Sequence, residues 1–162
     1  AREIALVMRI VVYRVLFILS VVMLGPIIGG QMGLLSGSRP LGLGVNNGQL
    51  KQAPNKPNCV NSQSQKGSSK ISPLAYTGGA KAALARLKAI VEAMSTAKVI
   101  EARSEYFYAE FTSSLMGFVD DVEFYVDEKA SVIHVRSASR LGYRDFDVNR
   151  KRVEAIREAF GK

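Results

Sequence analysis

The sequence predicts an α+β fold, in which one membrane-spanning helix and a long extended arm precede a small domain of four antiparallel strands and two helices. Three observations lead to this prediction. Residues 15–38 carry no charged side chain, residues 39–77 show no regular hydrophobic period, and residues 78–162 change from helical to strand periodicity and back. Such a change of period is typical of helices packed on one face of an antiparallel sheet.

The N-terminal segment, residues 1–38, is predicted to be a retained membrane anchor. Its charge-free run, VLFILSVVMLGPIIGGQMGLLSGS, is 24 residues long, and about 20 apolar residues suffice to cross a bilayer. A cleaved signal peptide, the alternative, usually has a shorter apolar region and a small-residue cleavage site. Arg2, Arg9 and Arg14 precede the run. By the positive-inside rule they place the N-terminus in the cytoplasm or stroma and the C-terminal domain in the lumen or periplasm.

Four glycines recur at every fourth position of this run: Gly25, Gly29, Gly33 and Gly37. They share one helix face if the helix continues through Pro26 to Gly37. Small residues let two helix backbones approach closely, which is a main source of attraction between helices in lipid. The spacing therefore predicts packing against a partner helix of an integral membrane protein complex. The alternatives are that glycine is simply common in membrane helices and that Pro26 breaks this one.

Residues 39–77 form the predicted arm. Gly, Asn, Pro, Ser and Gln dominate its composition, which fits either a flexible tether or an extended segment laid on a surface. The segment also carries the apolar residues Leu41, Leu43, Val45, Leu50, Val60, Ile71, Leu74 and Tyr76. These are too many for a pure spacer, so we expect an arm that is at least partly docked.

The soluble domain begins with a predicted helix at about residues 79–94, which Thr77 can cap. Its apolar residues form one stripe at helical spacing: Leu84, Leu87, Val91 and Met94. Four segments rich in Val, Ile, Phe and Tyr follow, and their short connections favour antiparallel strands. These segments are residues 98–105, 106–113, 118–126 and 131–140. Asp147 is predicted to cap a final helix that ends near Phe160.

Two carboxylates and two arginines are predicted to meet on the sheet. Asp121 and Glu123 share one face of their strand, and Arg136 and Arg140 share one face of the next strand. The four side chains could form an anion-binding or acid–base site. A ladder of ion pairs between neighbouring strands is the more frequent arrangement. We therefore interpret them as a structural ion-pair cluster.

The first turn of the final helix carries three cations, Arg150, Lys151 and Arg152. The helix dipole disfavours cations at this position by about 0.3–1 kcal/mol each. We expect an acidic or hydrogen-bonding group to compensate, either within the domain or on an acidic partner.

Composition and motifs argue against several function classes. Residues 1–75 hold eight Lys/Arg and one acid, whereas residues 76–162 hold 14 basic and 13 acidic residues, so nucleic-acid binding by the folded domain is not expected. A single cysteine, Cys59, excludes an intramolecular disulfide, and Cys59 with the single histidine, His134, argues against a metal site. The chain has no phosphate-binding loop, dinucleotide-binding turn or nucleophile elbow. We therefore assign no catalytic residue and leave the question of a cofactor open. We interpret Cys59 and His134 as structural residues.

Several of these segments resemble the domain-of-unknown-function 1499 family of bacteria and plastids. The matching stretches are LGVNNGQL (43–50), PNCVNSQ (57–63), GFVDDVEF (117–124), VRSASRLGY (135–143) and NRKRVE (149–154). The resemblance implies an exported or membrane-anchored domain without assigned catalytic residues, and the cyanobacterial and plastid members suggest a thylakoid setting. Residues 51–54 depart from the family pattern, which commonly has a Cys-Pro pair there. If the family's second cysteine is the partner of the one at Cys59, this chain has lost that redox or disulfide option.

Together these features predict a non-enzymatic accessory or assembly subunit of a larger membrane protein complex, preferably a photosynthetic one, in contact with membrane lipid. The alternative is a membrane-tethered enzyme or small-ligand-binding domain that uses the four charged strand residues. A concave pocket with unpaired carboxylates would favour the alternative. Flat, paired charges, with contacts spread along the anchor and arm, would favour the subunit.

Overall fold

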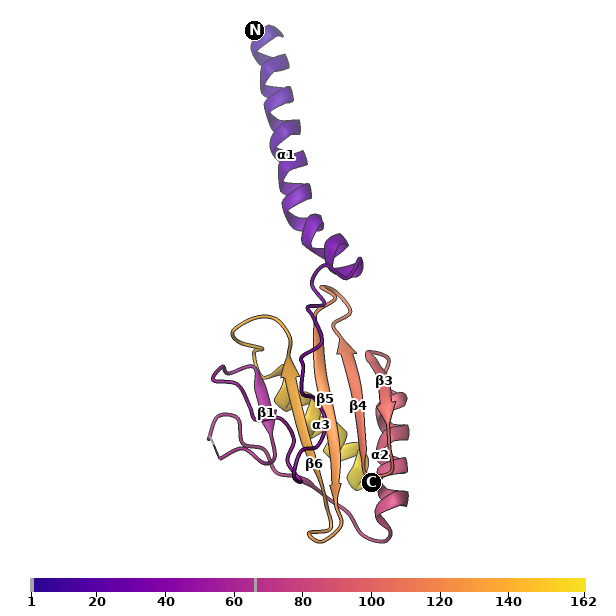
Figure 1. The fold of residues 1–162 in the computed structure, drawn as a ribbon. Coiled ribbons are helices and arrows are strands. Elements are labelled where there is room, and N and C mark those ends of the chain that lie inside the picture. The colour runs from indigo at the N-terminus through magenta and orange to yellow at the C-terminus, as the bar shows by residue number, and fades with distance from the viewer. Residues whose placement is uncertain (1, 66) are drawn as a thin grey trace.

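The computed structural model describes residues 2–65 and 67–162. A long helix, α1 (Arg2–Gln31), precedes an α+β domain. The elements of the domain are β1 (Cys59–Asn61), β2 (Leu74–Ala75), α2 (Ala80–Glu92), β3 (Ala97–Ala102), β4 (Tyr106–Thr112), β5 (Val119–Asp127), β6 (Val132–Ser139) and α3 (Val148–Gly161). Figure 1 shows α1 extending away from one end of the sheet, while α2 and α3 lie against one of its faces. The antiparallel α+β architecture and the apolar N-terminal helix agree with the sequence prediction.

The prediction of four strands was wrong. Within the described residues the sheet has six strands, in the order β1-β6-β5-β4-β3, with β2 pairing with β6 beside β1. All pairs are antiparallel. The two additional strands, β1 and β2, lie inside the predicted arm and are three and two residues long. Strands this short cannot display a period of two, so only their pairing with β6 identifies them.

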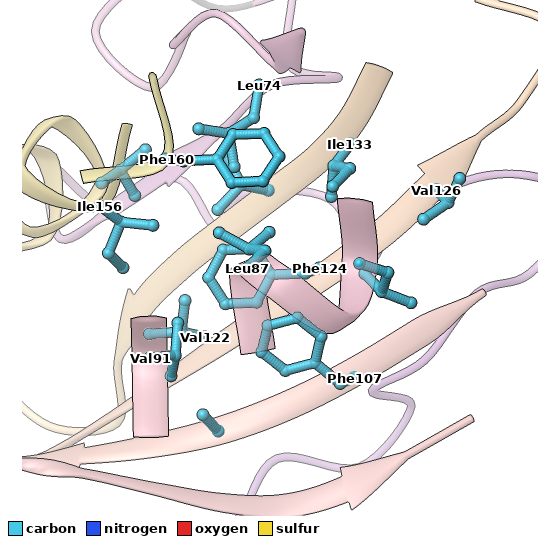
Figure 2. Close-up of a cluster of buried hydrophobic side chains, with 14 of the residues drawn as sticks. Leu74, Leu87, Val91, Phe107, Val122, Phe124, Val126, Ile133, Ile156 and Phe160 are labelled. Atoms are coloured by element: carbon cyan, nitrogen blue, oxygen red, sulfur yellow. The ribbon is translucent and has the colours of Figure 1, made fainter. Parts of the chain in front are cut away.

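The main hydrophobic core lies between the sheet and the helices α2 and α3. Leu87 and Val91 of α2 and Ile156 of α3 are fully buried there. Figure 2 shows these side chains gathered over the rings of Phe107 and Phe124, whose centroids lie 4.5 Å apart. The two rings come from neighbouring strands and lie directly opposite each other in the β4–β5 register. Helical spacing in α2 and alternation in β4 and β5 therefore place the apolar residues on the same side of the sheet.

Thr77 does not occupy the N-cap position of α2, and Asp147 occupies that of α3 as predicted but without the expected side-chain hydrogen bond. Gly79 and Asp147 occupy the N-cap positions, and within the described residues neither forms a side-chain capping hydrogen bond. At the start of α3 the backbone N–H of Asn149 donates instead to Asp145 Oδ2, at 2.9 Å. Phe146 and Asp147 both adopt positive φ angles, 53° and 64°. This reversal of the chain brings the carboxylate of Asp145, rather than that of Asp147, over the first turn of α3.

The helix α1 is long and apolar enough to cross a membrane, by its length and composition. A membrane anchor and a signal sequence both meet this criterion. The helix continues through Pro26, so this proline does not break it, and it ends at Gln31. The condition for a shared glycine face, a helix that reaches Gly37, is therefore not met.

A Schellman motif ends α1. Gly33 N–H donates to the carbonyl of Gly30 at 2.9 Å, and Leu34 N–H donates to the carbonyl of Gly29 at 3.0 Å. Gly33 has a φ of +82°, which is the left-handed conformation that this motif requires. Gly25 and Gly29 lie in α1, whereas Gly33 and Gly37 lie beyond it, so the four predicted glycines do not share one helix face.

The C-terminal end of α1 packs on the tip of the β4–β5 hairpin. A Cβ atom on Gly30 would lie 2.0 Å from the carbonyl oxygen of Met116, and one on Gly117 would lie 2.1 Å from the carbonyl oxygen of Gly30. Gln31 Nε2 also donates to two carbonyls of the hairpin, at 2.7 and 3.1 Å. The close approach thus uses Gly30, a glycine outside the predicted series of four.

Residues 39–50, which we call the sheet arm, cross the face of the sheet opposite α2 and α3 (Figure 1). Leu50 is buried against Tyr106 and Tyr108, and Leu43 packs on the same cluster. The backbone N–H of Gly44 donates to the Glu123 carboxylate at 2.7 Å. The sheet therefore has an apolar face under the helices and a second covered face under the sheet arm.

Candidate functional site

The face under the sheet arm carries polar side chains from three neighbouring strands. Side chains alternate along a strand, so every second residue of β4, β5 and β6 points to this face. We call the set the arm-face network: Tyr106, Tyr108, Glu110, Asp121, Glu123, Arg136 and Arg140. It contains all four charged residues that the sequence predicted to meet.

Glu123 and Arg136 form the most deeply buried ion pair of the network. They lie directly opposite each other in the β5–β6 register. Arg136 Nη1 lies 3.1 Å from Glu123 Oε2, and the two side chains are 4% and 0% exposed. The other carboxylate oxygen accepts hydrogen bonds from the Tyr106 hydroxyl at 3.1 Å and from Gly44 N–H at 2.7 Å. Among the described residues Arg136 Nε has no hydrogen-bond partner, so the carboxylate is better satisfied than the guanidinium.

Arg140 joins two further carboxylates. Its Nε lies 3.1 Å from both oxygens of Asp121, and its Nη2 lies 2.7 Å from Asp121 Oδ1 and 2.5 Å from Glu110 Oε1. The Tyr108 hydroxyl lies 2.5 Å from Asp121 Oδ1. From the sheet arm, Arg39 Nη2 reaches Glu110 at 2.7 Å. Three arginines thus face three carboxylates, and their formal charges cancel.

The protonation equilibria follow from burial and from these contacts. Burial, with the nearby carboxylates of Glu123 and Asp121, raises the pKa of Tyr106 and of Tyr108. Burial acts to raise the pKa of Glu110, but hydrogen bonds from Arg39, Arg140 and Tyr108 outweigh it and lower that pKa. The tyrosines therefore stay neutral hydrogen-bond donors at neutral pH, while Glu110 stays ionised.

The cations at the start of α3 find partners inside the domain. Arg152 Nη2 lies 2.5 Å from Asp120 Oδ2, on the face of β5 that points toward the helices. Arg150 donates to two backbone carbonyls of residues 68–70, at 3.0 Å each. Lys151 is exposed. Of the two expected sources of compensation, the domain itself therefore serves Arg150 and Arg152.

Asn149 connects Arg152 to the rest of the domain, in a part of the structure that sequence reasoning did not single out. Its amide oxygen accepts from Arg152 Nη1 at 2.7 Å and from the Ser137 hydroxyl at 2.5 Å. Its amide nitrogen donates to the Ser139 hydroxyl at 2.9 Å and to Asp145 at 2.8 Å. The side chain is fully buried. The only sequence signal for it was its place at the start of the last stretch that resembles the family.

Cys59 pairs with Ala138 of β6, and His134 lies in the same strand, so both lie near the arm-face network. Among the described residues no group of three His, Cys, Asp or Glu side chains could hold a metal ion. Cys59 is buried, and burial raises its pKa to about 11. His134 Nδ1 lies 3.1 Å from the Ser62 hydroxyl, and burial lowers the histidine pKa although Asp127 opposes this effect.

The buried thiol should make stability depend on alkaline pH. The pKa of Cys59 is 9.0 when unperturbed and about 11 in the folded chain, so above pH 9 the unfolded chain loses this proton first. The protonated thiol contributes fully to the free energy of unfolding below about pH 9. This contribution, about 3 kcal/mol at most, is lost as the pH rises to about 11. Urea unfolding at about pH 9 and about pH 11 should show a smaller fall in the free energy of unfolding for Cys59→Ala than for the wild type. Equal losses would contradict the assignment, because the tyrosines contribute to both proteins alike.

One cavity lies beside the sheet arm rather than over the arm-face network. It has a volume of about 170 Å³, and Gln49, Leu50, Asn61 and Gln63 contribute to its wall. The polar part of the wall consists of uncharged groups, and none of the described residues that line it belongs to the arm-face network. A second cavity, of about 210 Å³, touches the arm-face network at Tyr106, and its wall includes Arg103 and Glu105. The four charged residues that the sequence predicted to meet line neither cavity.

Sequence reasoning missed Tyr106, Tyr108 and Glu110 of the arm-face network. A signal for them existed, because they occupy alternate positions of the predicted strand 106–113 and so share one face. Arg39 gave no such signal, since its partner Glu110 is distant in sequence and only the path of the sheet arm brings the two together.

Comparison with known families identifies the domain. The model of a family described as "Protein of unknown function (DUF1499)" matches residues 49–160. The match spans the end of the sheet arm, the whole sheet, α2 and nearly all of α3, which is more than half of the chain. No curated protein and no solved structure matches the sequence. The resemblance seen in the sequence is confirmed, and the chain belongs to the domain-of-unknown-function 1499 family.

Proposed function

We propose that the chain is a non-enzymatic accessory or assembly subunit of a larger membrane protein complex. In this proposal α1 is a retained anchor that packs against a partner helix, and the domain lies on the lumenal or periplasmic side. A photosynthetic complex of the thylakoid membrane is the preferred partner, because the family resemblance includes cyanobacterial and plastid proteins.

The pairing of the arm-face network is the observation that supports this proposal. An acid–base or anion-binding site needs a charged group that a ligand can reach. Here Asp121 and Glu123 are buried and paired with arginines, and the sheet arm closes over them. Arg39 of the arm binds Glu110, and the backbone N–H of Gly44 binds Glu123, so the network fixes the arm to the sheet. Such a network suits a rigid connection between an anchor and a domain.

A membrane-tethered enzyme or ligand-binding domain is the second candidate. The observation in its favour is Arg136 Nε, a buried donor without a hydrogen-bond partner among the described residues. A ligand that used this donor would have to displace the sheet arm, which Gly44 holds to Glu123. This requirement places the ligand-binding function second.

Gly25→Leu should weaken the association of α1 with its partner. The helix surface at Gly25 is open, since a Cβ atom there would meet no heavy atom of the described chain within 4 Å. Leucine adds bulk without polarity, so it should disturb helix packing and leave insertion unchanged. A loss of about 1–2 kcal/mol corresponds to roughly a tenfold drop in recovered partner subunits. The measurement is mass spectrometry of proteins that co-purify with the tagged chain in mild detergent.

Met23→Leu is the matched control. Met23 is exposed on α1 two residues from Gly25, and therefore on a different face of the helix. The Met23→Leu variant should recover the partner subunits at the wild-type level. If Gly25→Leu recovers as much of the partner subunits as the wild type does, the helix face that carries Gly25 does not hold the partner. Purification of the wild type without any integral membrane protein would refute the proposed function itself.

A further inference from the structure

Exposed apolar side chains gather at the end of the domain from which α1 emerges. The loop between β6 and α3, residues 140–147, contains Leu141, Tyr143 and Phe146, which are 41%, 65% and 84% exposed. Leu115, at the tip of the β4–β5 hairpin, and Leu34, just after α1, are exposed as well. We call this surface the proximal rim.

Strand pairing explains why these segments lie together. Asp120, at the start of β5, pairs with Ser139, at the end of β6, so the β6–α3 loop leaves the sheet beside the β4–β5 hairpin. Gly37 follows α1 and lies against the same loop, since a Cβ atom there would be 3.0 Å from Leu141 Cγ. In Figure 1 the loop and the hairpin both point toward the end of the molecule that carries α1.

The opposite end of the domain has a different character. The β5–β6 turn there exposes Glu128 and Lys129, and the β3–β4 turn exposes Arg103 and Glu105. The turns at this charged end suit water, whereas the end beside α1 exposes large apolar side chains together with Arg144 and Asp147. This asymmetry runs along the direction in which α1 leaves the domain (Figure 1).

Phe146 shows that the loop holds an apolar side chain outward. Its φ of 53° is left-handed, a conformation that bulky residues rarely adopt. Asp145 supports this conformation through its hydrogen bonds to the backbone and side chain of Asn149, at 2.9 and 2.8 Å. The turn that places Asp145 over the start of α3 thus also leaves the phenylalanine side chain exposed.

The position of α1 identifies what covers the proximal rim. The charge-free part of α1 ends at Gln31, and the hairpin packs directly on Gly30. A bilayer crossed by α1 would therefore have its interface at the level of the hairpin and the β6–α3 loop. Tyrosine and large apolar side chains favour this interfacial region. We propose that the proximal rim inserts into the lipid interface through Tyr143, Phe146 and Leu115, as a second membrane contact beside α1. The inference rests on the proposed anchoring by α1.

Single tryptophans can test this insertion, because the chain contains no tryptophan. The variants Phe146→Trp, Lys129→Trp and Phe17→Trp are made in the full chain and placed in phosphatidylcholine nanodiscs, with and without bromine on the acyl chains. Phe17 lies in α1, and Lys129 lies at the charged end of the domain. Brominated lipid should quench Phe146→Trp and Phe17→Trp and should shift neither the intensity nor the wavelength of Lys129→Trp.

The three variants separate the two proposals. Quenching of Phe17→Trp without quenching of Phe146→Trp would overturn the insertion of the proximal rim and leave the anchor intact. Equal quenching of Lys129→Trp and Phe146→Trp would also overturn it, because both ends of the domain would then touch the lipid alike. Quenching of Phe146→Trp alone would support the insertion and overturn the anchoring by α1. If neither Phe17→Trp nor Phe146→Trp is quenched, both proposals are overturned.

Discussion

Arg136→Ala is expected to lower the free energy of unfolding by about 3–5 kcal/mol, because it leaves the buried Glu123 carboxylate without its cation. Glu123 is fully buried, and Arg136 is its cationic partner at 3.1 Å. Hydrogen bonds from Tyr106 and Gly44 remain, but they cannot neutralise the charge. Glu123→Gln keeps the shape of the side chain and should destabilise the domain less. Urea unfolding of the full chain in detergent, monitored by circular dichroism, measures the free energy of unfolding of both variants.

Two further variants make this result specific. Arg103→Ala removes an arginine that is 70% exposed and paired with Glu101, so it should change stability by less than about 1 kcal/mol. The double variant Arg136→Met with Glu123→Leu removes both buried charges and should recover most of the stability that Arg136→Ala loses. If Arg136→Ala unfolds at the same urea concentration as the wild type, the ion-pair interpretation is wrong. The ligand-binding alternative would then take first place.

Asn149→Ala should cost about 2–4 kcal/mol, because several buried groups lose their partners together. Ser137 and Arg152 lose an acceptor, and the carbonyl of Asn58 loses a donor that lies 3.2 Å away. These groups belong to β6, α3 and the segment before β1, so the change should loosen the packing of α3 on the sheet. The same urea unfolding experiment provides the measurement.

Lys151→Ala is the matched control in the same helix. Lys151 is exposed, and its replacement should change stability by no more than about 0.5 kcal/mol. A loss for Asn149→Ala as small as that of the control would show that the buried amide is dispensable.

The charged cluster on the sheet shows where sequence reasoning succeeds. Alternation along a strand is a local property, so Asp121 and Glu123 were assigned to one face without knowledge of the fold. Their pairing with Arg136 and Arg140 required only that two consecutive strands form a hairpin, which the short connection favours. The helices α2 and α3 were found for the same reason, because a period of 3.6 is also local.

The length of α1 shows where local reasoning stops. Absence of charge predicted an apolar segment to residue 38, but Gly33 ends the helix earlier by adopting a left-handed conformation. A glycine permits this conformation without requiring it. The close contact of Gly30 with Met116 depends on where the hairpin lies, and the fourfold glycine spacing gave no information about it.

The sequence by itself determined the class of the fold, the apolar helix, the family and the sharing of faces by residues two apart, because each depends on residues that are neighbours in the chain. Only the tertiary structure decided that β1 and β2 exist, that the side chain of Asp145 rather than that of Asp147 caps α3, and that Arg39 and Gly44 tie the arm to Glu110 and Glu123. In each of these cases the stabilising partner is brought close by the path of the backbone. Hydrogen bonds and ion pairs act over a few ångströms, so such a contact exists only once the chain has folded.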